Sequence, residues 1–290
     1  MPVQWFPGHM AKAGRQIREK LRLCDAVFEL RDARIPRSSA NPLLDQLLGD
    51  KPRVIVLNKA DLADPSATRA WIAALTAGGY PTLKVDAVRG AGIGSVARAL
   101  HSIPPGRLPA RLLRPLRVMA VGIPNVGKSS FINRLVGQRA ARTGRQAGLT
   151  RGPQWIRIAR DIELLDMPGI LWPKFEDPET GMRLAVCGAI RDDAFSVVEA
   201  AEWLLGWFLA NSAAALRRRF RLPALPRDGA ELLPLIAIRR GLVMHGGMPD
   251  VEKAAVALLK EFREGRLGRY TLDVPPAWRP EESGTPGPGV

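Results

Sequence analysis

The chain has 290 residues, of which 46% are hydrophobic, and it carries a formal net charge of +15. This length and composition predict a folded protein with one large core or two smaller ones, and they exclude a disordered chain. So basic a chain favours a polyanionic partner, with nucleic acid as the first interpretation and an anionic membrane as the second. A solvated basic surface in an arginine-rich composition is the plainer alternative.

Cysteine content and hydropathy indicate the cellular compartment of the protein. The two cysteines, Cys24 and Cys187, are too few for a disulfide framework or a structural zinc site. Each lies in an apolar stretch, so we expect two buried, reduced thiols. The first residues contain no apolar signal region, and no run of about 18 apolar residues occurs. We therefore expect a cytoplasmic protein without stable membrane association.

The N-terminal stretch, residues 5–10, combines Pro, Gly and two aromatic residues, and it predicts an arm anchored on a core. A helix is expected from about residue 10 to residue 23, because apolar residues recur there at helical spacing. His9 is the titratable group of the arm. It has two interpretations, a functional group near the site and a capping or surface histidine.

Two short apolar stretches, residues 25–30 and 53–57, predict buried strands. The first ends in the polar turn R-D-A-R-I-P, and the second leads into the tetrapeptide N-K-A-D. Ligands of open α/β sheets bind beyond the carboxyl ends of strands, which is where this tetrapeptide falls. N-K-x-D is the guanine reader of GTPases, since Asp61 can accept from the guanine N1–H and exocyclic amine, a donor pair that adenine lacks. Taken alone, the tetrapeptide is equally compatible with a helix cap.

A helix near residues 66–77, a strand at 82–85 and a helix near 93–101 are expected next. The strand leads into Asp-Ala and a Gly-rich turn. The backbone N–H of that alanine is placed to reach the guanine O6, and aspartate stands where serine is usual in this motif. The residues expected to bind the base are Asn58, Lys59, Asp61, Asp86 and Ala87.

Residues 122–129 read G-I-P-N-V-G-K-S, between an apolar stretch (116–121) and a helical repeat, and they follow a Pro- and Arg-rich linker (104–115). In this context the motif predicts a phosphate-binding loop, because its glycines let backbone N–H groups point at a polyphosphate. The helix N-terminus adds partial positive charge, the lysine neutralises the β- and γ-phosphates, and the serine hydroxyl can bind Mg²⁺. A glycine turn with a chance Lys-Ser is the alternative. The expected nucleotide contacts are Pro124, Asn125, Val126, Gly127, Lys128, Ser129 and Ser130.

After this helix, residues 137–152 are polar, basic and Gly-rich, which is typical of a segment that is mobile without ligand. Within it, Thr150 offers a hydroxyl for Mg²⁺ and an N–H for the γ-phosphate. A strand hairpin is then expected, and it ends in D-M-P-G. Asp166 of that motif can hold Mg²⁺ through water, and the N–H of Gly169 can bind the γ-phosphate.

The five GTPase motifs occur in rotated order, with the two guanine-reading motifs before the three phosphate motifs. Joining the ends of a GTPase domain and cutting after the D-x-x-G strand gives this order. The sequence resembles the circularly permuted ribosome-assembly GTPases, and within them the bacterial large-subunit assembly factors; organellar members share the motifs. The matching motifs are W-F-P-G-H-M (5–10), D-A-R-I-P (32–36), N-K-x-D, G-I-P-N-V-G-K-S, Thr150 and D-M-P-G-I-L-W-P (166–173).

The resemblance implies a circularly permuted Ras-like P-loop GTPase domain, with a doubly wound, mostly parallel α/β sheet, followed by an all-α domain. We expect the first over residues 1–175, a helical, basic RNA-binding domain over 176–275, and a disordered tail over 276–290. It also implies GTP and GDP as ligands, with Mg²⁺. The implied function is GTP hydrolysis by a monomer that binds the large ribosomal subunit precursor, both rRNA and ribosomal proteins, late in its assembly. A mitochondrial location is implied if the chain is an organellar member.

The motifs do not include a residue that would activate the attacking water. Ile170 and Leu171 follow D-x-x-G, where Ras-like enzymes have a glutamine that positions the water. We therefore expect slow hydrolysis that the ribosomal subunit stimulates. Asn125 resembles the residue that helps to hold K⁺ in K⁺-activated GTPases, or else it only stabilises the loop. The resemblance places His9 near the switch region. The residues expected to take part in catalysis are His9, Lys128, Thr150 and Gly169.

Beyond residue 178 the pattern is helical, with apolar stripes over 194–215 and 251–262 that predict a bundle core. Arginine clusters within 217–221, 239–240 and 263–269 suit RNA phosphates, and a solvated basic face is the alternative. Two rival functions remain. One is a nucleotide-gated RNA-binding module whose hydrolysis is incidental, and the other is a GTPase that acts at a membrane surface.

Overall fold

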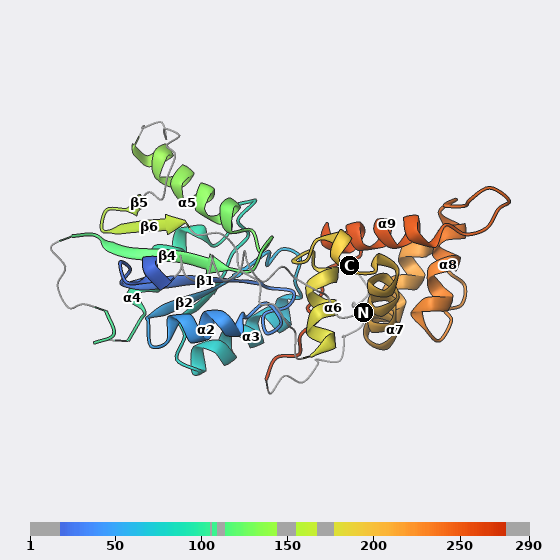
Figure 1. The fold of residues 1–290 in the computed structure, drawn as a ribbon, viewed down its shortest axis with the longest axis horizontal. Helices are drawn as coiled ribbons and strands as arrows, with labels where there is room; N and C mark the ends of the chain where they lie inside the picture. The colour runs from blue at the N-terminus through green and yellow to red at the C-terminus, as the bar shows by residue number, and fades with distance from the viewer. Residues whose placement is uncertain (1–17, 105, 109–113, 144–154, 167–176, 277–290) are drawn as a thin grey trace, which may run out of the picture.

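The structure is a computed structural model, and it describes residues 18–104, 106–108, 114–143, 155–166 and 177–276. Figure 1 shows a part built on a β-sheet at one end of the long axis and a cluster of helices at the other. In the part of the chain that is described, no helix is both long and apolar enough to cross a membrane.

One six-stranded sheet has the order β3-β2-β1-β4-β6-β5, and every neighbouring pair is parallel except β5 with β6. The chain adds β2 and β3 outward from β1, then returns to place β4 on the other side of β1. The carboxyl ends of β1 and β4 therefore form a topological switch point, the usual place for a ligand in such sheets. The strands are β1 (Ala26–Asp32), β2 (Arg53–Asn58), β3 (Thr82–Lys84), β4 (Leu116–Gly122), β5 (Trp155–Ala159) and β6 (Ile162–Asp166).

Helices cover both faces of the sheet, as the predicted doubly wound fold requires. On one face, Phe28 of β1 meets Phe131 edge to face, with ring centroids 5.9 Å apart. On the other, Val27 packs with Leu44, and Leu57 packs with Trp71. The helices of this part that are described in full are α2 (Pro42–Leu48), α3 (Pro65–Ala77), α4 (Val96–His101) and α5 (Lys128–Thr143).

The helical part consists of α6 (Pro178–Val186), α7 (Val197–Phe220), α8 (Gly229–Arg239) and α9 (Val251–Arg263). Its core includes Phe208 of α7 and Phe262 of α9, which meet edge to face with centroids 6.3 Å apart. Each helix begins at a side chain that accepts a hydrogen bond from a backbone N–H of the first turn, which satisfies a donor that would otherwise lack a partner. These N-caps are Asp177, Ser196, Asp228 and Asp250.

Three elements differ from the prediction. Strand β1 continues through Asp32 instead of ending before Arg31, because both charged side chains are buried in ion pairs. Helix α5 runs to Thr143, past Gly137, where an irregular segment was expected. Helix α7 spans the predicted apolar stretch, but it is kinked at Ser212, whose φ of −158° is not helical.

The chain beyond α9 returns to the sheet part. The N–H of Tyr270 donates to the Leu62 carbonyl at 3.1 Å, and that of Leu272 to the Arg34 carbonyl at 2.7 Å. The Asp273 carboxylate accepts from the backbone N–H of Ser38 at 2.7 Å. The last described segment, which was predicted to belong to the helical domain over residues 176–275, thus packs against the predicted first domain over residues 1–175.

Candidate nucleotide-binding site

The phosphate-binding motif lies between β4 and α5, as its sequence predicts. Two glycines are needed there for different reasons. A Cβ on Gly122 would lie 2.7 Å from the Leu30 carbonyl oxygen, so β1 and β4 approach too closely for a side chain. Gly127 has a φ of +91°, and a Cβ there would lie 2.3 Å from Nδ2 of Asn58. The loop can therefore curve into the α5 N-terminus, a position that favours anions.

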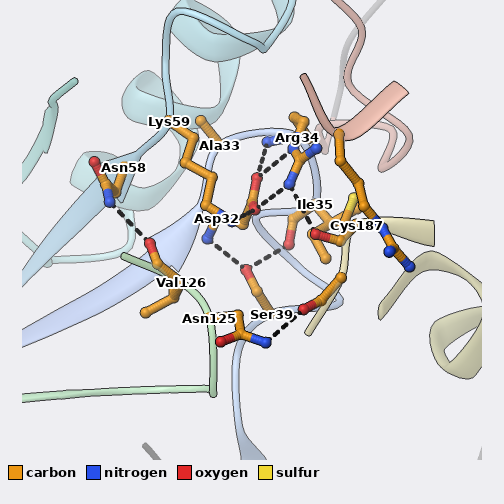
Figure 2. Close-up of polar contacts among 12 residues, drawn as sticks. Asp32, Ala33, Arg34, Ile35, Ser39, Asn58, Lys59, Asn125, Val126 and Cys187 are labelled. Carbon is orange, nitrogen blue, oxygen red and sulfur yellow. Dashed lines mark hydrogen bonds and ion pairs between the residues drawn. The ribbon is translucent and has the colours of Figure 1, made fainter. Parts of the chain in front are cut away.

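Asn58 joins three predicted motifs. Its Nδ2 donates to the Val126 carbonyl of the phosphate loop at 2.8 Å, as Figure 2 shows, and its Oδ1 accepts from the Ala87 N–H at 3.1 Å. The side chain is buried, so both bonds are shielded from water. The Ala87 N–H, predicted to reach the guanine O6, donates to Asn58 in this structure. A bond to O6 stays a prediction, and it would have to share or replace that contact.

Asp86, which stands where serine is usual, builds the turn that presents Ala87. Its Oδ1 accepts from the N–H groups of Val88 and Arg89, both at 2.9 Å. Arg134 of α5 donates to the carbonyls of Ala87 and Val88. The second guanine-reading loop is thus held by its own aspartate and by the helix that follows the phosphate loop.

These loops border a cavity of about 340 Å³, within the range of small-molecule sites. Asp61 lies in its wall, and among the described residues its carboxylate has no hydrogen-bond or ion-pair partner, so it is available as an acceptor. A second hollow of about 350 Å³ lies over the phosphate loop and is lined by Lys128, Ser129 and Ser130. The other residues of the cavity wall include Asn58, Lys59, Asp86, Ala87, Asn125 and Gly127.

The D-A-R-I-P segment was predicted only as a polar turn, but its buried Asp32 and Arg34 form a charge cluster with Lys59, as Figure 2 shows. Arg34 and Lys59 also line the cavity. The Asp32 carboxylate accepts from Nε and Nη2 of Arg34 at 2.9 and 2.7 Å, and Nζ of Lys59 lies 3.0 Å from its Oδ2. Burial alone would raise the pKa of Asp32, but the charges of Arg34 and Lys59 outweigh it and hold that pKa well below its ordinary value. The carboxylate is therefore ionised.

Asn125, the candidate K⁺ ligand, has a third role in the structure. It has a φ of 55°, and its Nδ2 donates to the Gly188 carbonyl at 2.9 Å (Figure 2). Gly188 follows the carboxyl end of α6. The phosphate loop is thus bonded directly to the helical part of the chain, a contact that the sequence did not predict. The potassium role stays a prediction.

Three predicted catalytic residues, His9, Thr150 and Gly169, lie outside the described residues, as do Ile170 and Leu171. Asp166 ends β6, opposite Ala120 of β4 in the sheet register. The D-x-x-G motif therefore begins beside the strand that leads to the phosphate loop.

A magnesium ion suits this site. Within the described residues, no group of three or more His, Cys, Asp or Glu side chains could hold a metal alone. Mg²⁺ commonly takes few protein ligands and completes its shell with phosphates and water. The Ser129 hydroxyl, exposed in the first turn of α5, is one oxygen of the required kind.

Some arginines of the predicted clusters form ion pairs within the helical part, and others have no ion-pair partner among the described residues. Arg219 and Arg240 bind the buried carboxylate of Glu261, the first with Nε at 3.0 Å. Arg263 binds Asp192. Arg218, Arg221 and Arg239 are exposed and have no partner among the described residues. These clusters are thus only partly available for RNA.

The predicted phosphate loop lies at the switch point, and Asn58 of one predicted guanine-reading loop bonds to it and to the other such loop, both of which precede it in sequence. This arrangement is that of a circularly permuted P-loop GTPase. Residues 117–207 match the family described as "50S ribosome-binding GTPase". The chain is 45% identical to ribosome biogenesis GTPase A of Priestia megaterium over 95% of this chain and 98% of that protein. It therefore belongs to the ribosome biogenesis GTPase A family, which confirms the resemblance seen in the motifs.

Two further relatives extend the comparison. Mitochondrial ribosome-associated GTPase 1 of Mus musculus is 35% identical over 93% of this chain and 90% of its own length. The crystal structure of GNP-bound YlqF from T. maritima has a TM-score of 0.66 and 28% identity, and it covers 91% of this chain and 98% of that one. A GDP-bound form of the same protein matches equally well, with a TM-score of 0.66. The predicted fold class is confirmed.

Proposed function

We propose that this GTPase is a switch in late assembly of the large ribosomal subunit. It binds the pre-subunit in the GTP state and leaves after hydrolysis. The observation that carries the proposal is the cavity where Asn58 holds the phosphate loop against both guanine-reading loops. The ribosome is the partner because relatives in bacteria and mitochondria are named for it.

The reaction is hydrolysis of GTP to GDP and phosphate. Asp61 selects guanine by accepting its N1–H and amine, and Lys128 neutralises charge on the phosphates. The hydroxyls of Ser129 and Thr150, with Asp166 through water, would hold Mg²⁺. The ion would offset the phosphate charge that grows in the transition state. The Gly169 N–H binds the γ-phosphate.

The water must be activated by something other than a glutamine. We keep two candidates, His9 of the arm and a K⁺ ion held with the help of Asn125. Turnover is therefore slow for the protein alone, and the ribosomal subunit stimulates it. Equal turnover in K⁺ and Na⁺ would remove the second candidate.

The helical part offers the contact to rRNA. Arg218, Arg221 and Arg239 are exposed, and arginine binds phosphates and stacks on unpaired bases. We infer that this surface binds the subunit precursor. The relatives at 41–45% identity are bacterial, which supports a cytoplasmic setting, whereas those at 34–35% support a mitochondrial alternative.

Sedimentation with separated ribosomal subunits tests the proposal. We expect the protein to migrate with the large subunit when loaded with a non-hydrolysable GTP analogue, and to stay behind when loaded with GDP. Migration with both subunits, whatever the nucleotide, would favour a generic RNA-binding protein.

An Asp61→Asn variant separates the switch from an RNA-binding module with incidental hydrolysis. Asparagine places an amide donor where guanine also has a donor, but xanthine has a carbonyl there, so preference should change from GTP to XTP. A switch then loads onto the large subunit with an XTP analogue and no longer with the GTP analogue. An RNA-binding module keeps the same affinity for the large subunit with either nucleotide analogue.

A further inference from the structure

The buried Asp32–Arg34 pair, which contacts Lys59, has no role in the function proposed above. Asp32 ends β1, and in the sheet register it lies opposite Asn58, the residue before Lys59. Three cationic or N–H donors converge on its carboxylate: the Arg34 fork, the Arg34 backbone N–H at 3.0 Å, and the Lys59 ammonium. Asp32 and Arg34 are 2% and 1% exposed, so water does not screen these contacts.

Lys59 needs such support, because its backbone is in the left-handed region with a φ of 59°. A non-glycine residue is strained there unless neighbouring contacts hold it. The ion pair to Asp32 fixes the side chain of Lys59 two residues before the base-reading carboxylate of Asp61. Arg34 also lines the cavity, and its charge interacts with that of Asp61.

Arg34 extends the cluster to the helical part of the chain. Its Nη2 donates to the Cys187 carbonyl at 3.0 Å, and its guanidinium lies 5.6 Å from the ring centroid of Phe262 in α9. Lys59 and the segment after α6 are therefore linked through two side chains. A shift of the N-K-x-D loop would have to break or move these contacts.

We propose that Asp32 and Arg34 are positioning residues for guanine-nucleotide binding, which they support by fixing Lys59 and the loop that carries Asp61. The proposal rests on the proposed function only in requiring that the protein binds GTP and GDP. The cluster acts on affinity, because its ion pair to Lys59 holds the loop that carries the base-reading Asp61.

An Asp32→Asn variant tests this. Loss of a charge-assisted contact to Lys59 should weaken GDP and GTP binding about tenfold. KM for GTP should rise while kcat changes less than about twofold. Binding is measured with fluorescent GDP and GTP analogues, and turnover is measured by phosphate release.

A double-mutant cycle with Lys59→Ala distinguishes positioning from a general structural effect. If Asp32 acts through Lys59, the Asp32→Asn change should cost little further affinity once Lys59 is alanine. Additive losses would overturn the proposal. Because Asp32→Asn leaves Arg34 buried without its partner, the cycle is repeated with Asp32→Asn/Arg34→Gln, which removes both charges.

Glu29 provides a matched control on the same strand. It is 2% exposed and pairs with Arg31 and Arg53, away from the cavity. Glu29→Gln should lower stability and leave nucleotide affinity unchanged, and equal loss of affinity in both variants would contradict the proposal. If the unmodified protein binds neither nucleotide, the proposed function fails. If it binds both and Asp32→Asn binds as well, only this inference fails.

Discussion

At the scale of single residues, the site depends on backbone positions that few side chains can occupy. Gly127 combines a φ of +91° with Asn58 packed where its Cβ would lie. Lys59 and Asn125 also have positive φ values, so three strained or permissive positions lie around one cavity. Such conformations persist only when neighbouring contacts hold them, which is common where a site must be formed before its ligand binds.

Gly127→Ala should therefore weaken nucleotide binding by at least about tenfold, because Asn58 must move and release the phosphate loop. Fluorescent GDP titration measures the loss. Gly137→Ala, in α5 with no atom within 4 Å of the added Cβ, is the control and should bind normally. Normal binding by Gly127→Ala would show that the loop does not need Asn58 at that distance.

The lowered pKa of Asp32 should also make the stability of the protein depend on pH. Its folded pKa lies below the ordinary value of 3.8, so the folded state favours the ionised form. The resulting stabilisation is full above the unfolded pKa and is lost as pH falls below about 4 toward the folded pKa. At pH 7, Asp32→Asn should lower the free energy of unfolding by about 3 kcal/mol, as for other broken buried pairs.

Urea unfolding of the wild type and Asp32→Asn at pH 7, 5 and 3 measures this. The difference between the two proteins should stay constant from pH 7 to 5 and shrink at pH 3. A difference that grows on acidification would mean that the carboxyl is not held ionised in the folded state.

At the scale of elements, one buried carboxylate connects the helices of the helical part within their apolar core. Glu261 of α9 is 5% exposed and binds Arg219 of α7 and Arg240 after α8. One carboxylate therefore joins three helices. The position of Glu261 also explains why neighbouring arginines differ in role. Arg219 and Arg240 bind its carboxylate, whereas Arg218 and Arg239 have no ion-pair partner among the described residues.

Glu261→Gln should lower the free energy of unfolding by about 2 kcal/mol, less than for fully buried pairs because both arginines are partly exposed. Chemical denaturation followed by circular dichroism measures it. Glu252→Gln, exposed on the same helix, should be nearly neutral. Equal effects of the two changes would show that the Glu261 pairs add nothing.

At the scale of the whole molecule, the sheet part and the helical part meet at the nucleotide site. Asn125 bonds to Gly188, and Arg34 bonds to Cys187, and both side chains line the cavity. In the permuted order, β6 is also followed in sequence by α6. These bonds connect the phosphate loop and Arg34 beside the N-K-x-D loop to the same segment after α6, and the proposed nucleotide-dependent switch requires such a connection.

The sequence predicted the parts of the site that local chemistry determines. The phosphate loop and N-K-x-D can each be recognised from a few consecutive residues. The strands that precede them can be recognised as apolar runs. It did not predict the partner of Asp32 or of Asn125. Those contacts depend on the register of β1 with β2 and on the packing of α6, which unite residues far apart in the chain. Likewise, nothing local distinguishes Arg219 from Arg218 before Glu261 is placed.

Steady-state GTP hydrolysis by the protein alone, with large subunits and with small subunits is the most direct test of a switch that acts on the large subunit. We expect slow turnover by the protein alone and a rise of roughly 10²-fold or more with the large subunit, the range over which a supplied catalytic group acts. The small subunit should have no effect. Turnover that neither subunit changes, or that both change equally, would contradict a switch that acts on the large subunit.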